Sequence, residues 1–458
     1  MVQKVKSTED QVLTVNALSH EGRGLATLNN RTIFIDNALP EEVVRISYVK
    51  KSRRYDEAKA DEIIKASPQR VEPHCAHFTI CGGCSLQHMK SDAQISHKEK
   101  VLLEHLAHFG KITAEKVLPP IRGSIFGYRR KARLGVRFVA KKAKFLVGFR
   151  EKYSNKLAEI AQCEVLHPSV GKRLTELQML IHGLEGMQSI PQIEVAVGDG
   201  ETALVFRHLA QLSSHDQQSL IEFSNKTDIL IYLQPKGPES IHLLHPERAT
   251  EYLDYAFPAY GIRFFFKPQD FTQINSEINQ QMVKQAIDLL EPKSNDCILD
   301  LFCGLGNFSL PLARFAKRVI GIEGNDQMTL RAAYNAEQNG ISNAMFIAMN
   351  LEEITSEAWS KTRLTAVTAG INPQIECINK VLLDPPRTGA YPLVSFLAKE
   401  KTIEKIVYVS CNPATLARDL GVLVHEGKFH LKSVQVLDMF PHTAHVESMA
   451  LLVRQKKW

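Results

Sequence analysis

The pattern of apolar and polar positions changes near residue 296, where short apolar runs begin to alternate with helical stretches. Runs of β-branched and aliphatic residues at 297–302, 318–323, 380–383 and 406–409 predict strands that are buried on both faces. Two further runs, at 431–439 and 446–453, predict strands near the end of the chain. Strands that alternate with helices favour a parallel, doubly wound sheet. Residues 266–458 are therefore predicted to form a Rossmann-like α/β domain.

Residues 1–62 follow a different pattern, with short alternating runs at 12–15, 32–35 and 42–46 separated by glycine, asparagine and proline. This spacing of strands and turns favours a small barrel of the oligonucleotide-binding (OB) kind over residues 1–65. Between the two regions, residues 90–109 predict a helix, 121–160 predict strands, and 164–258 predict both. The fold class is thus predicted as α/β and β multidomain, with an α+β central domain over residues 66–265.

A compact group of cysteines opens the predicted central domain, in residues 75–84 (CAHFTICGGC). Cys163 is the next cysteine and the last before position 297. Thiolates at this spacing, with glycines that let the backbone wrap tightly, are typical of a metal site. Four thiolates suit either a zinc ion or an iron–sulfur cluster. A mixed zinc site stays open through His74, His77 and His88.

Composition limits the class of protein. The 458 residues are 44% hydrophobic and 23% charged, which is typical of a globular chain of two or three domains. No apolar run approaches the roughly 20 residues that span a bilayer, and residues 1–10 lack a signal-peptide core. A cytoplasmic protein with no membrane partner is expected. The eight cysteines are then better explained by metal binding or catalysis than by a disulfide framework.

The net charge of +6 is unevenly distributed, because residues 122–152 hold eleven Lys and Arg and a single acid, Glu151. Phenylalanine and tyrosine are interleaved with these cations. Basic and aromatic residues together suit phosphate backbones and unstacked bases, which favours single-stranded RNA as a partner. A solvated face of a sheet is the alternative interpretation.

A glycine-rich turn follows the first strand of the C-terminal region, at Gly304 and Gly306, and the second strand ends in Glu323. A turn of this kind lets a ligand approach the backbone, and the carboxylate can accept hydrogen bonds from ribose hydroxyls. Ser309 stands where a dinucleotide fingerprint has its third glycine. Asp300 just before the glycines favours S-adenosylmethionine as the cofactor.

Cys411 lies between the strand predicted at 406–409 and a helix that Asn412 is predicted to cap, with Pro413 in the first turn. The free N–H groups of a helix N-terminus favour a thiolate, so we expect a lowered pKa and a nucleophile. The alternative is a small buried apolar residue. Because Gly304, Glu323, Asp384 and Cys411 all follow predicted strands, they are expected to meet at the carboxyl edge of one sheet.

Four segments resemble, in order, the signatures of the RNA uracil-C5 methyltransferases: 300–308 (DLFCGLGNF), 383–387 (LDPPR), 409–413 (VSCNP) and 445–448 (HVES). The likeness is strongest to the branch that acts on bacterial 23S ribosomal RNA, with an N-terminal TRAM barrel and a [4Fe-4S] cluster. It implies Cys411 as the nucleophile, Glu447 as the base and Phe271 as a stacking partner of the target base. It implies S-adenosylmethionine binding by Gln273, Phe302, Asn307, Glu323, Asn350 and Asp384. It implies cluster ligation by Cys75, Cys81, Cys84 and Cys163.

The predicted reaction is methylation of C5 of a uridine in a single-stranded or loop region of 23S ribosomal RNA, through a covalent adduct of Cys411 with C6. We expect a monomer, with no DNA partner. The alternatives are a tRNA uracil-C5 methyltransferase and a non-catalytic RNA-binding protein. A tRNA-acting relative is expected to lack both the barrel and the cysteine group. The sequence departs from the family in a longer connection over residues 355–379.

Overall fold

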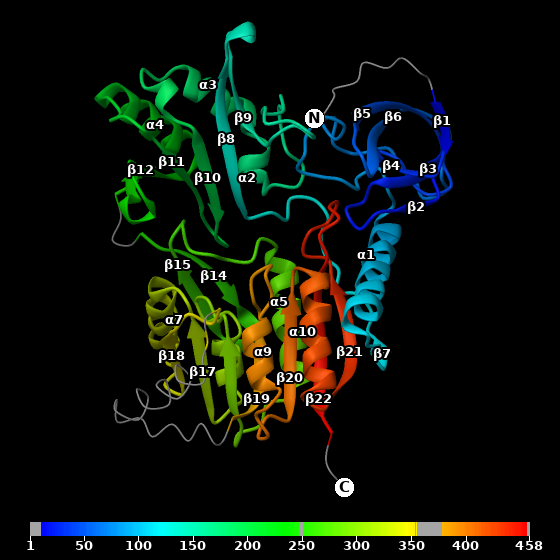
Figure 1. Cartoon of the computed structure of the whole chain (residues 1–458). Helices are drawn as coiled ribbons and strands as arrows, with labels where there is room; N and C mark the ends of the chain where they lie inside the picture. The colour runs from blue at the N-terminus through cyan, green and yellow to red at the C-terminus, as the bar shows by residue number, and fades with distance from the viewer. Residues whose placement is uncertain (1–10, 248–250, 353, 355–377, 456–458) are drawn as a thin grey trace.

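The computed structural model describes residues 11–247, 251–352, 354 and 378–455, and three larger sheets organise them (Figure 1). The N-terminal sheet lies at the upper right of Figure 1, the middle sheet at the upper left, and the C-terminal sheet below both. Residues 355–377 of the longer connection expected at 355–379 lie outside the described residues. Residues 378 and 379 belong to strand β19 (Ile378–Leu383).

The N-terminal sheet has six strands in the order β1-β5-β6-β4-β3-β2. It curls into the ring seen in Figure 1 around small and β-branched side chains, among them Val15, Ile33 and Ile46. The strands are β1 (Gln11–Thr14), β2 (Ala17–Leu18), β3 (Gly24–Leu28), β4 (Arg31–Asp36), β5 (Val43–Lys51) and β6 (Tyr55–Lys65).

A connecting segment carries the cysteine group and then runs down the side of the C-terminal sheet (Figure 1). Its helix α1 (Ser91–His105) continues into one π-helical turn, η1 (Leu106–Gly110), so the helix predicted at 90–109 is present. The two-residue strand β7 (Lys116–Val117) follows and pairs in parallel with β21 (Phe429–Leu437) at the edge of the C-terminal sheet.

The middle sheet has the order β13-β12-β11-β10-β8-β9, with helices packed on it. Its strands are β8 (Lys131–Val139), β9 (Lys144–Gly148), β10 (Gln192–Val197), β11 (Thr202–Arg207), β12 (Ile229–Gln234) and β13 (His242–His245). Its helices are α2 (Pro168–Gly171), α3 (Leu174–His182) and α4 (Ser214–Thr227), with 3-10 turns η2 (Ala140–Lys142), η3 (Met187–Ser189) and η4 (Pro238–Ser240). A hairpin of β14 (Leu253–Phe257) and β15 (Ile262–Phe266), joined by η5 (Pro258–Tyr260), leads to the C-terminal sheet.

The C-terminal sheet has eight strands in the order β18-β17-β16-β19-β20-β22-β21-β7. Strands β18 to β20 in this order are parallel, and β22 runs antiparallel to both neighbours. The remaining strands are β16 (Cys297–Leu301), β17 (Arg318–Glu323), β18 (Ala344–Ala348), β19 (Ile378–Leu383), β20 (Lys405–Ser410) and β22 (Glu447–Arg454). The predicted doubly wound α/β sheet is confirmed, since helices cover both of its faces.

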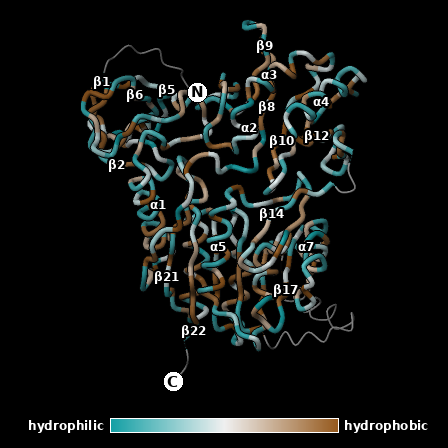
Figure 2. Tube along the Cα trace, turned by 180° about the vertical axis from the view of Figure 1, so that it is seen from behind, coloured by the Kyte–Doolittle hydropathy of each residue, from teal (hydrophilic) through white to brown (hydrophobic). Residues whose placement is uncertain are grey.

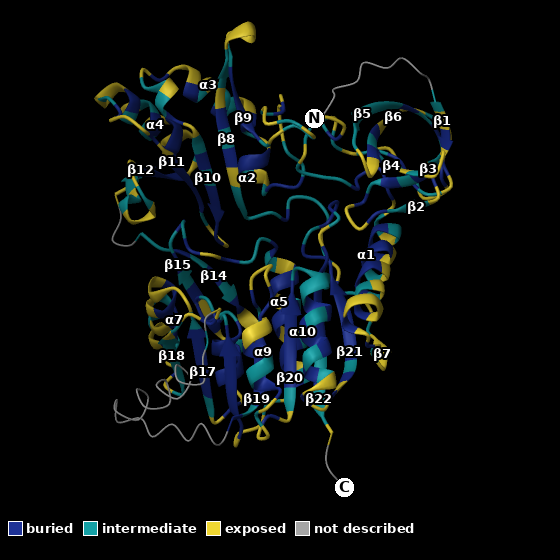
Figure 3. Ribbon diagram, in the orientation of Figure 1, coloured by how far each residue is buried: buried dark blue, intermediate teal, exposed yellow. Residues whose placement is uncertain are grey.

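Alternate residues of the central strands face opposite layers of helices, as the twofold repeat of a strand requires. Leu382 and Val407 pack with α5, α6 and α7 and with the β14–β15 hairpin, whereas Val381 and Ile406 pack with α1, α9 and α10. The helices are α5 (Ser276–Leu290), α6 (Ser309–Ala313), α7 (Asp326–Gln338), α9 (Tyr391–Leu397) and α10 (Pro413–His425). Apolar residues concentrate along the strands (Figure 2), and these strands are the most deeply buried part of the chain (Figure 3). Within the described residues, no helix is both long and apolar enough to cross a membrane.

Candidate active site

The carboxyl ends of β16, β17, β19 and β20 meet at one edge of the C-terminal sheet, which faces the middle sheet in Figure 1. Glu323 ends β17, and its Oε2 accepts a hydrogen bond from the Gly304 N–H at 3.1 Å. Its Oε1 accepts another from the Asn325 N–H at 3.0 Å. The predicted pairing of the glycine turn with the acid of the next strand is therefore present.

The turn after β16 has an unusual backbone. Gly304 and Gly306 have φ values of +54° and +92°, a region that glycine enters without steric cost. Phe302 has φ +64° although it carries a side chain, and its N–H donates to the Ile322 carbonyl at 2.8 Å. Non-glycine residues in this region are strained and cluster at functional sites. The hydrogen bond to the Ile322 carbonyl helps to keep Phe302 in this strained conformation.

Asn307 is fixed by two residues outside the turn. Its amide exchanges hydrogen bonds with the Asn279 amide, at 2.9 and 3.0 Å, and its Oδ1 also accepts from the Tyr255 hydroxyl at 2.9 Å. Asn279 comes from α5 and Tyr255 from β14, so neither could be linked to the turn by spacing in the sequence.

Two aspartates at the ends of β16 and β19 hold protons more tightly than usual. Burial, with a contribution from the nearby Asp384 carboxyl, raises the pKa of Asp300 to about 7. Burial also raises the pKa of Asp384 to about 7. Asp384 Oδ2 accepts a hydrogen bond from the Gln273 side chain at 3.3 Å, and Asp300 Oδ2 accepts from the Ser309 hydroxyl at 2.5 Å. Of the predicted cofactor-binding residues, Gln273 and Asp384 are thus in direct contact.

Cys411 follows β20, and Asn412 caps α10, since its Oδ1 accepts the Ala414 N–H at 3.0 Å. In the antiparallel pair of β20 and β22, Ser410 lies opposite Ser448. Continuing this register by one residue brings Cys411 beside Glu447, the first residue of β22. Nucleophile and base as predicted from the sequence therefore meet at the same edge.

The expected lowering of the Cys411 pKa by the helix N-terminus is wrong for the protein by itself. Burial raises the pKa of Cys411 to about 11, and the Glu447 and Asp384 carboxyls add to the rise. Burial raises the pKa of Glu447 well above its usual range, with a further contribution from Asp384. The Arg387 guanidinium opposes the rise for both groups.

Two residues of the predicted set, Asn350 and Phe271, are exposed near Glu323. Asn350 is exposed after β18, where its Oδ1 accepts the Glu352 N–H at 3.0 Å. Phe271 has 66% of its surface exposed and lines a groove that Glu323 and Asn325 also line. An exposed phenylalanine beside polar groups is compatible with stacking on a base.

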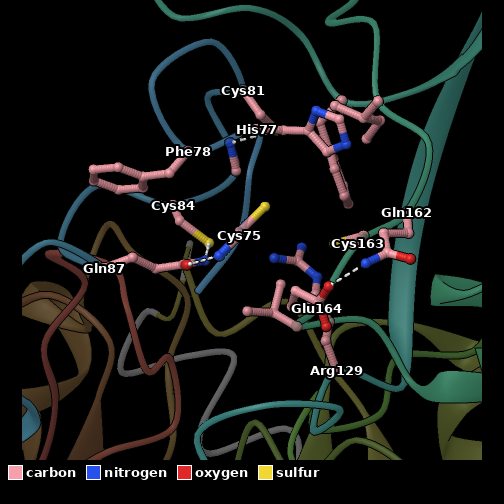
Figure 4. Close-up of a pocket in the computed structure, with 14 residues that line it drawn as sticks. Cys75, His77, Phe78, Cys81, Cys84, Gln87, Arg129, Gln162, Cys163 and Glu164 are labelled. Carbon is pink, nitrogen blue, oxygen red and sulfur yellow. Dashed lines mark hydrogen bonds between the residues drawn. The ribbon is translucent and has the colours of Figure 1, made fainter. Parts of the chain in front are cut away.

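The four cysteines predicted to bind metal line one pocket, shown in Figure 4: Cys75, Cys81, Cys84 and Cys163. Among the hydrogen bonds that reach its sulfur atoms, the Gln87 side chain donates to Cys84 Sγ at 3.3 Å and the Gly83 N–H donates to Cys81 Sγ at 3.4 Å. Burial raises the pKa of all four thiols, to about 12 for Cys84 and about 11 for Cys163. A positive charge in the pocket would reverse this effect, because it favours thiolates.

The histidines of the mixed zinc alternative are placed differently. His77 lines the pocket, but its Nε2 accepts the Ala161 N–H at 3.2 Å. His74 is exposed and pairs with Glu164, and His88 is buried outside the pocket lining. Among the other described cysteines, Cys297 is disulfide-bonded, an exception to the expectation that the cysteines serve metal or catalysis.

Known proteins resemble this chain along almost its whole length. The 23S rRNA (uracil(1939)-C(5))-methyltransferase RlmD of Hahella chejuensis is 50% identical over 446 residues, which cover 95% of this chain and 96% of the relative. The chain belongs to the RNA uracil-C5 methyltransferase family. The RlmD enzyme of Alcanivorax borkumensis is 46% identical and covers 97% of the chain and 96% of its own length. The family model described as tRNA (Uracil-5-)-methyltransferase matches residues 245–455.

A solved structure supports the same family. The Pyrococcus abyssi tRNA (uracil-54, C5)-methyltransferase, in complex with S-adenosyl-L-homocysteine, aligns with a TM-score of 0.72 and 26% identity over 96% of this chain and 99% of its own. The alignment covers 96% of this chain, so the expectation that a tRNA-acting relative lacks the N-terminal barrel is wrong for this relative. The expectation that such a relative lacks the cysteine group stays a prediction. Architecture alone does not separate rRNA-acting from tRNA-acting members.

In this uracil-C5 methyltransferase, about half of the cations in the basic segment 122–152 are paired with acids from elsewhere in the chain. Six of its eleven cations form ion pairs within the described residues: Arg122, Arg130, Arg133, Lys142, Lys144 and Lys152. Lys131 donates instead to the Pro268 and Asp270 carbonyls, both at 2.6 Å. The solvated-sheet alternative therefore describes much of the segment, and exposed Arg137 and Lys141 remain at the far end of the β8–β9 hairpin.

Proposed function

We propose that this protein methylates C5 of a uridine in 23S ribosomal RNA, with S-adenosylmethionine as the methyl donor. The proposal depends chiefly on one observation, the meeting of Cys411, Glu447 and Asp384 beside the Gly304–Glu323 turn. The 50% identity to an RlmD enzyme favours 23S ribosomal RNA and, by position, the uridine that corresponds to 1939. Its loop or single-stranded context would lower the cost of extruding the base.

The residues around the turn fit the proposed donor. A Cβ at Gly304 would meet no atom closer than Met328 Cε at 3.8 Å, so there is space above the turn. The two Glu323 oxygens each accept one backbone N–H and keep lone pairs for ribose hydroxyls. We assign donor binding to Gln273, Phe302, Asn307, Glu323, Asn350 and Asp384. When bound, the donor supplies an electrophilic methyl group and a positive sulfonium.

Charge in the site explains when Cys411 becomes reactive. The pKa of about 11 means that Cys411 holds its proton at neutral pH in the protein by itself, and burial raises the pKa of the neighbouring Glu447 as well. A cation beside them favours the ionised forms. Asp384, with a pKa of about 7, is partly ionised at neutral pH and is the neighbouring group that can accept the thiol proton.

Cys411 and Glu447 then perform the two halves of the reaction. The Cys411 thiolate adds to C6 of the uracil, which moves the electron pair of the C5–C6 double bond to an enolate that is nucleophilic at C5. C5 would take the methyl group from the donor held by the residues around the turn, with the demethylated donor as the leaving group. Glu447 removes the C5 proton, and the C6–S bond breaks so that the double bond re-forms and the thiolate is released. Phe271 is proposed to stack on the extruded base.

The cysteine pocket is proposed to hold a [4Fe-4S] cluster through Cys75, Cys81, Cys84 and Cys163. The four thiols line one pocket, and four thiolates are the ligand set of such a cluster. The N–H groups of Gln87 and Gly83, which already reach two of the sulfur atoms, would stabilise them.

The domain division that accompanies this function is an RNA-binding TRAM barrel at residues 1–65, a cluster-bearing central domain at 66–265 and a catalytic domain at 266–458. The curled sheet β1–β6 supports the first assignment. RNA contact by the barrel and by the free end of the β8–β9 hairpin would bring the target to the catalytic edge.

A tRNA uracil-C5 methyltransferase is the second candidate, favoured by the full-length likeness to the Pyrococcus abyssi enzyme. One assay separates the two: 23S rRNA and bulk tRNA from a strain lacking this protein are each incubated with the purified protein and methyl-labelled donor. We expect label only in 23S rRNA, at the uridine corresponding to 1939, and none with Cys411→Ala. Label confined to tRNA would overturn the rRNA assignment.

A further inference from the structure

The loop between β21 and β22 ends at the proposed base. Leu437 and Glu447 lie opposite each other as the last pair of this hairpin, so residues 438–446 form its connection. Glu447 is the first residue after the connection, and the path of residues 438–446 therefore determines how Glu447 enters the site. Cys411, by contrast, is held by β20 and by the capped start of α10.

The tip of this loop is bound by the residues that directly follow the last cysteine of the CGGC group. The N–H groups of Ser85 and Leu86 both donate to the His442 carbonyl at 2.9 Å. The Ser85 hydroxyl accepts the Ala444 N–H at 3.1 Å. The loop and residue Cys84 are thus separated by a single peptide unit and one hydrogen bond.

Gln94, in the first turn of α1, completes the contact and is 4% exposed. Its Oε1 accepts the His442 N–H at 3.0 Å, and its amide nitrogen lies 3.3 Å from His442 Nδ1. The same nitrogen donates to the carbonyls of Leu86 at 3.0 Å and Met89 at 2.8 Å. One buried amide therefore holds both the loop tip and the segment after the cysteines.

The tip of the loop has a strained backbone at His442. His442 has φ +65°, which is costly for a residue with a Cβ, and it is 5% exposed. Its ring lies 4.6 Å from that of Phe126, and the Tyr128 hydroxyl donates to the Pro441 carbonyl at 3.0 Å. The contacts around the tip come from residues more than 300 positions earlier in the chain.

We propose that Gln94 is a positioning residue that couples the cysteine segment to Glu447 through the 438–446 loop. Order in the segment around Cys84 then controls proton removal from C5, the second half of the reaction. This inference rests on the proposed function, because it takes Glu447 as the base. A displacement of about 1 Å at a catalytic group can cost roughly 100-fold in rate.

The test uses the full-length protein purified without oxygen, with Gln94→Met as the variant, because methionine is similar in length and favours helix. Gln178→Met is the matched control, since Gln178 is a helical glutamine whose amide donates to the Ile160 carbonyl beside the cysteine pocket at 2.9 Å rather than to the loop. Three quantities are compared: turnover, the amount of protein–RNA adduct that survives denaturation, and hydrogen exchange of a peptide covering residues 438–447.

We expect Gln94→Met to lower turnover roughly tenfold or more and to increase the adduct several-fold, because addition continues while elimination slows. Exchange at residues 438–447 should become faster, and donor affinity and iron content should stay at the parent values. The control should match the parent in all readouts. Should Gln94→Met fold poorly, Ser85→Ala, which removes only the bond to the Ala444 N–H, should shift exchange and adduct in the same direction by less.

In Gln94→Met, turnover and the amount of adduct could instead fall together, in proportion to the fraction of the variant that is folded. That result would mean a purely structural role for Gln94 and would overturn the proposal. Unchanged exchange at residues 438–447 would overturn it as well, and that readout does not depend on catalysis. Failure of the proposed function would be visible separately, as a parent protein without methyl transfer or a Glu447→Gln variant that forms no adduct.

Discussion

Lys98 and Asp438 form a buried ion pair whose disruption should have a large and measurable effect. The Lys98 side chain is fully buried and that of Asp438 is 5% exposed. Lys98 Nζ donates to Asp438 Oδ1 at 2.7 Å and to the Phe440 carbonyl at 3.0 Å. Burial lowers the pKa of Lys98, and the Asp438 carboxylate opposes this effect. Lys98→Met would leave a buried carboxylate with no cation beside it and a carbonyl with one donor fewer.

Removal of one partner from a buried pair costs about 3–5 kcal/mol, whereas replacement of both by apolar residues is often neutral. We therefore expect Lys98→Met to lower the free energy of opening of α1 and of residues 438–446 by about 3–5 kcal/mol. The double variant Lys98→Met/Asp438→Leu should recover most of that loss. Lys432→Met is the control: Lys432 lies on β21, the strand that precedes Asp438, and forms an exposed ion pair with Glu115, so its replacement should change stability little.

Native-state hydrogen exchange is the suitable assay, because a protein with several sheets does not unfold in two states and local opening is reported peptide by peptide. A loss below about 1 kcal/mol for Lys98→Met would refute the assignment of an uncompensated buried charge. A double variant as unstable as the single one would show instead that the loss comes from packing around Lys98.

Three further predictions concern the catalytic edge. In donor-free protein, alkylation of Cys411 should accelerate with pH up to about 11. Glu447→Gln should lower the pH midpoint of this alkylation, because a neighbouring negative charge is removed. Peptide mass spectrometry measures both, and an unshifted midpoint would contradict the influence of Glu447 on the Cys411 pKa. Glu323→Ala should weaken donor binding at least tenfold in calorimetry, since it removes the acceptor that also orients the Gly304 N–H; unchanged affinity would move the donor elsewhere. The pKa of Asp300 in the folded protein, about 7, exceeds its ordinary 3.8, so the free energy of unfolding should fall by up to roughly 4 kcal/mol as pH rises from about 4 to above 7. Asp300→Asn should flatten this dependence of stability on pH in denaturant titrations. An equal dependence in the variant would refute the assignment to Asp300.

Local features of the catalytic sheet could be predicted because each depends on residues that are neighbours in the sequence. The strand predicted at 406–409 is β20 (Lys405–Ser410), and Asn412 caps the following helix as its side chain and Pro413 indicate. The carboxyl-edge rule for parallel strands then brought Glu323, Asp384 and Cys411 together without knowledge of any contact.

Properties that depend on distant residues could not be predicted. Burial raises the Cys411 pKa, and β22 and the end of β19 add to the rise by bringing the Glu447 and Asp384 carboxyls to it. The sequence around Cys411 contains no sign of these carboxyls. The basic segment suggested a free cationic surface, but acids such as Glu194 and Glu159 pair with its cations only in the folded chain. The partners of Asn307 were missed for the same reason, because Asn279 and Tyr255 reach it only in the folded chain.

The pairing of β7 with β21 has a consequence for how the polypeptide is completed during synthesis. Residues 116–117 supply the outermost strand of a sheet whose other strands come from residues 297–454, and α1 and η1 lie against α10. During synthesis, the N-terminal third of the chain therefore cannot complete its contacts until the last strands have left the ribosome. Until then, the apolar faces of α1 and of the sheet edge stay exposed. A gene fragment that starts at residue 266 would expose the backbone of β21 as an open edge and invite aggregation, so a stable truncated enzyme has to retain residues 91–121.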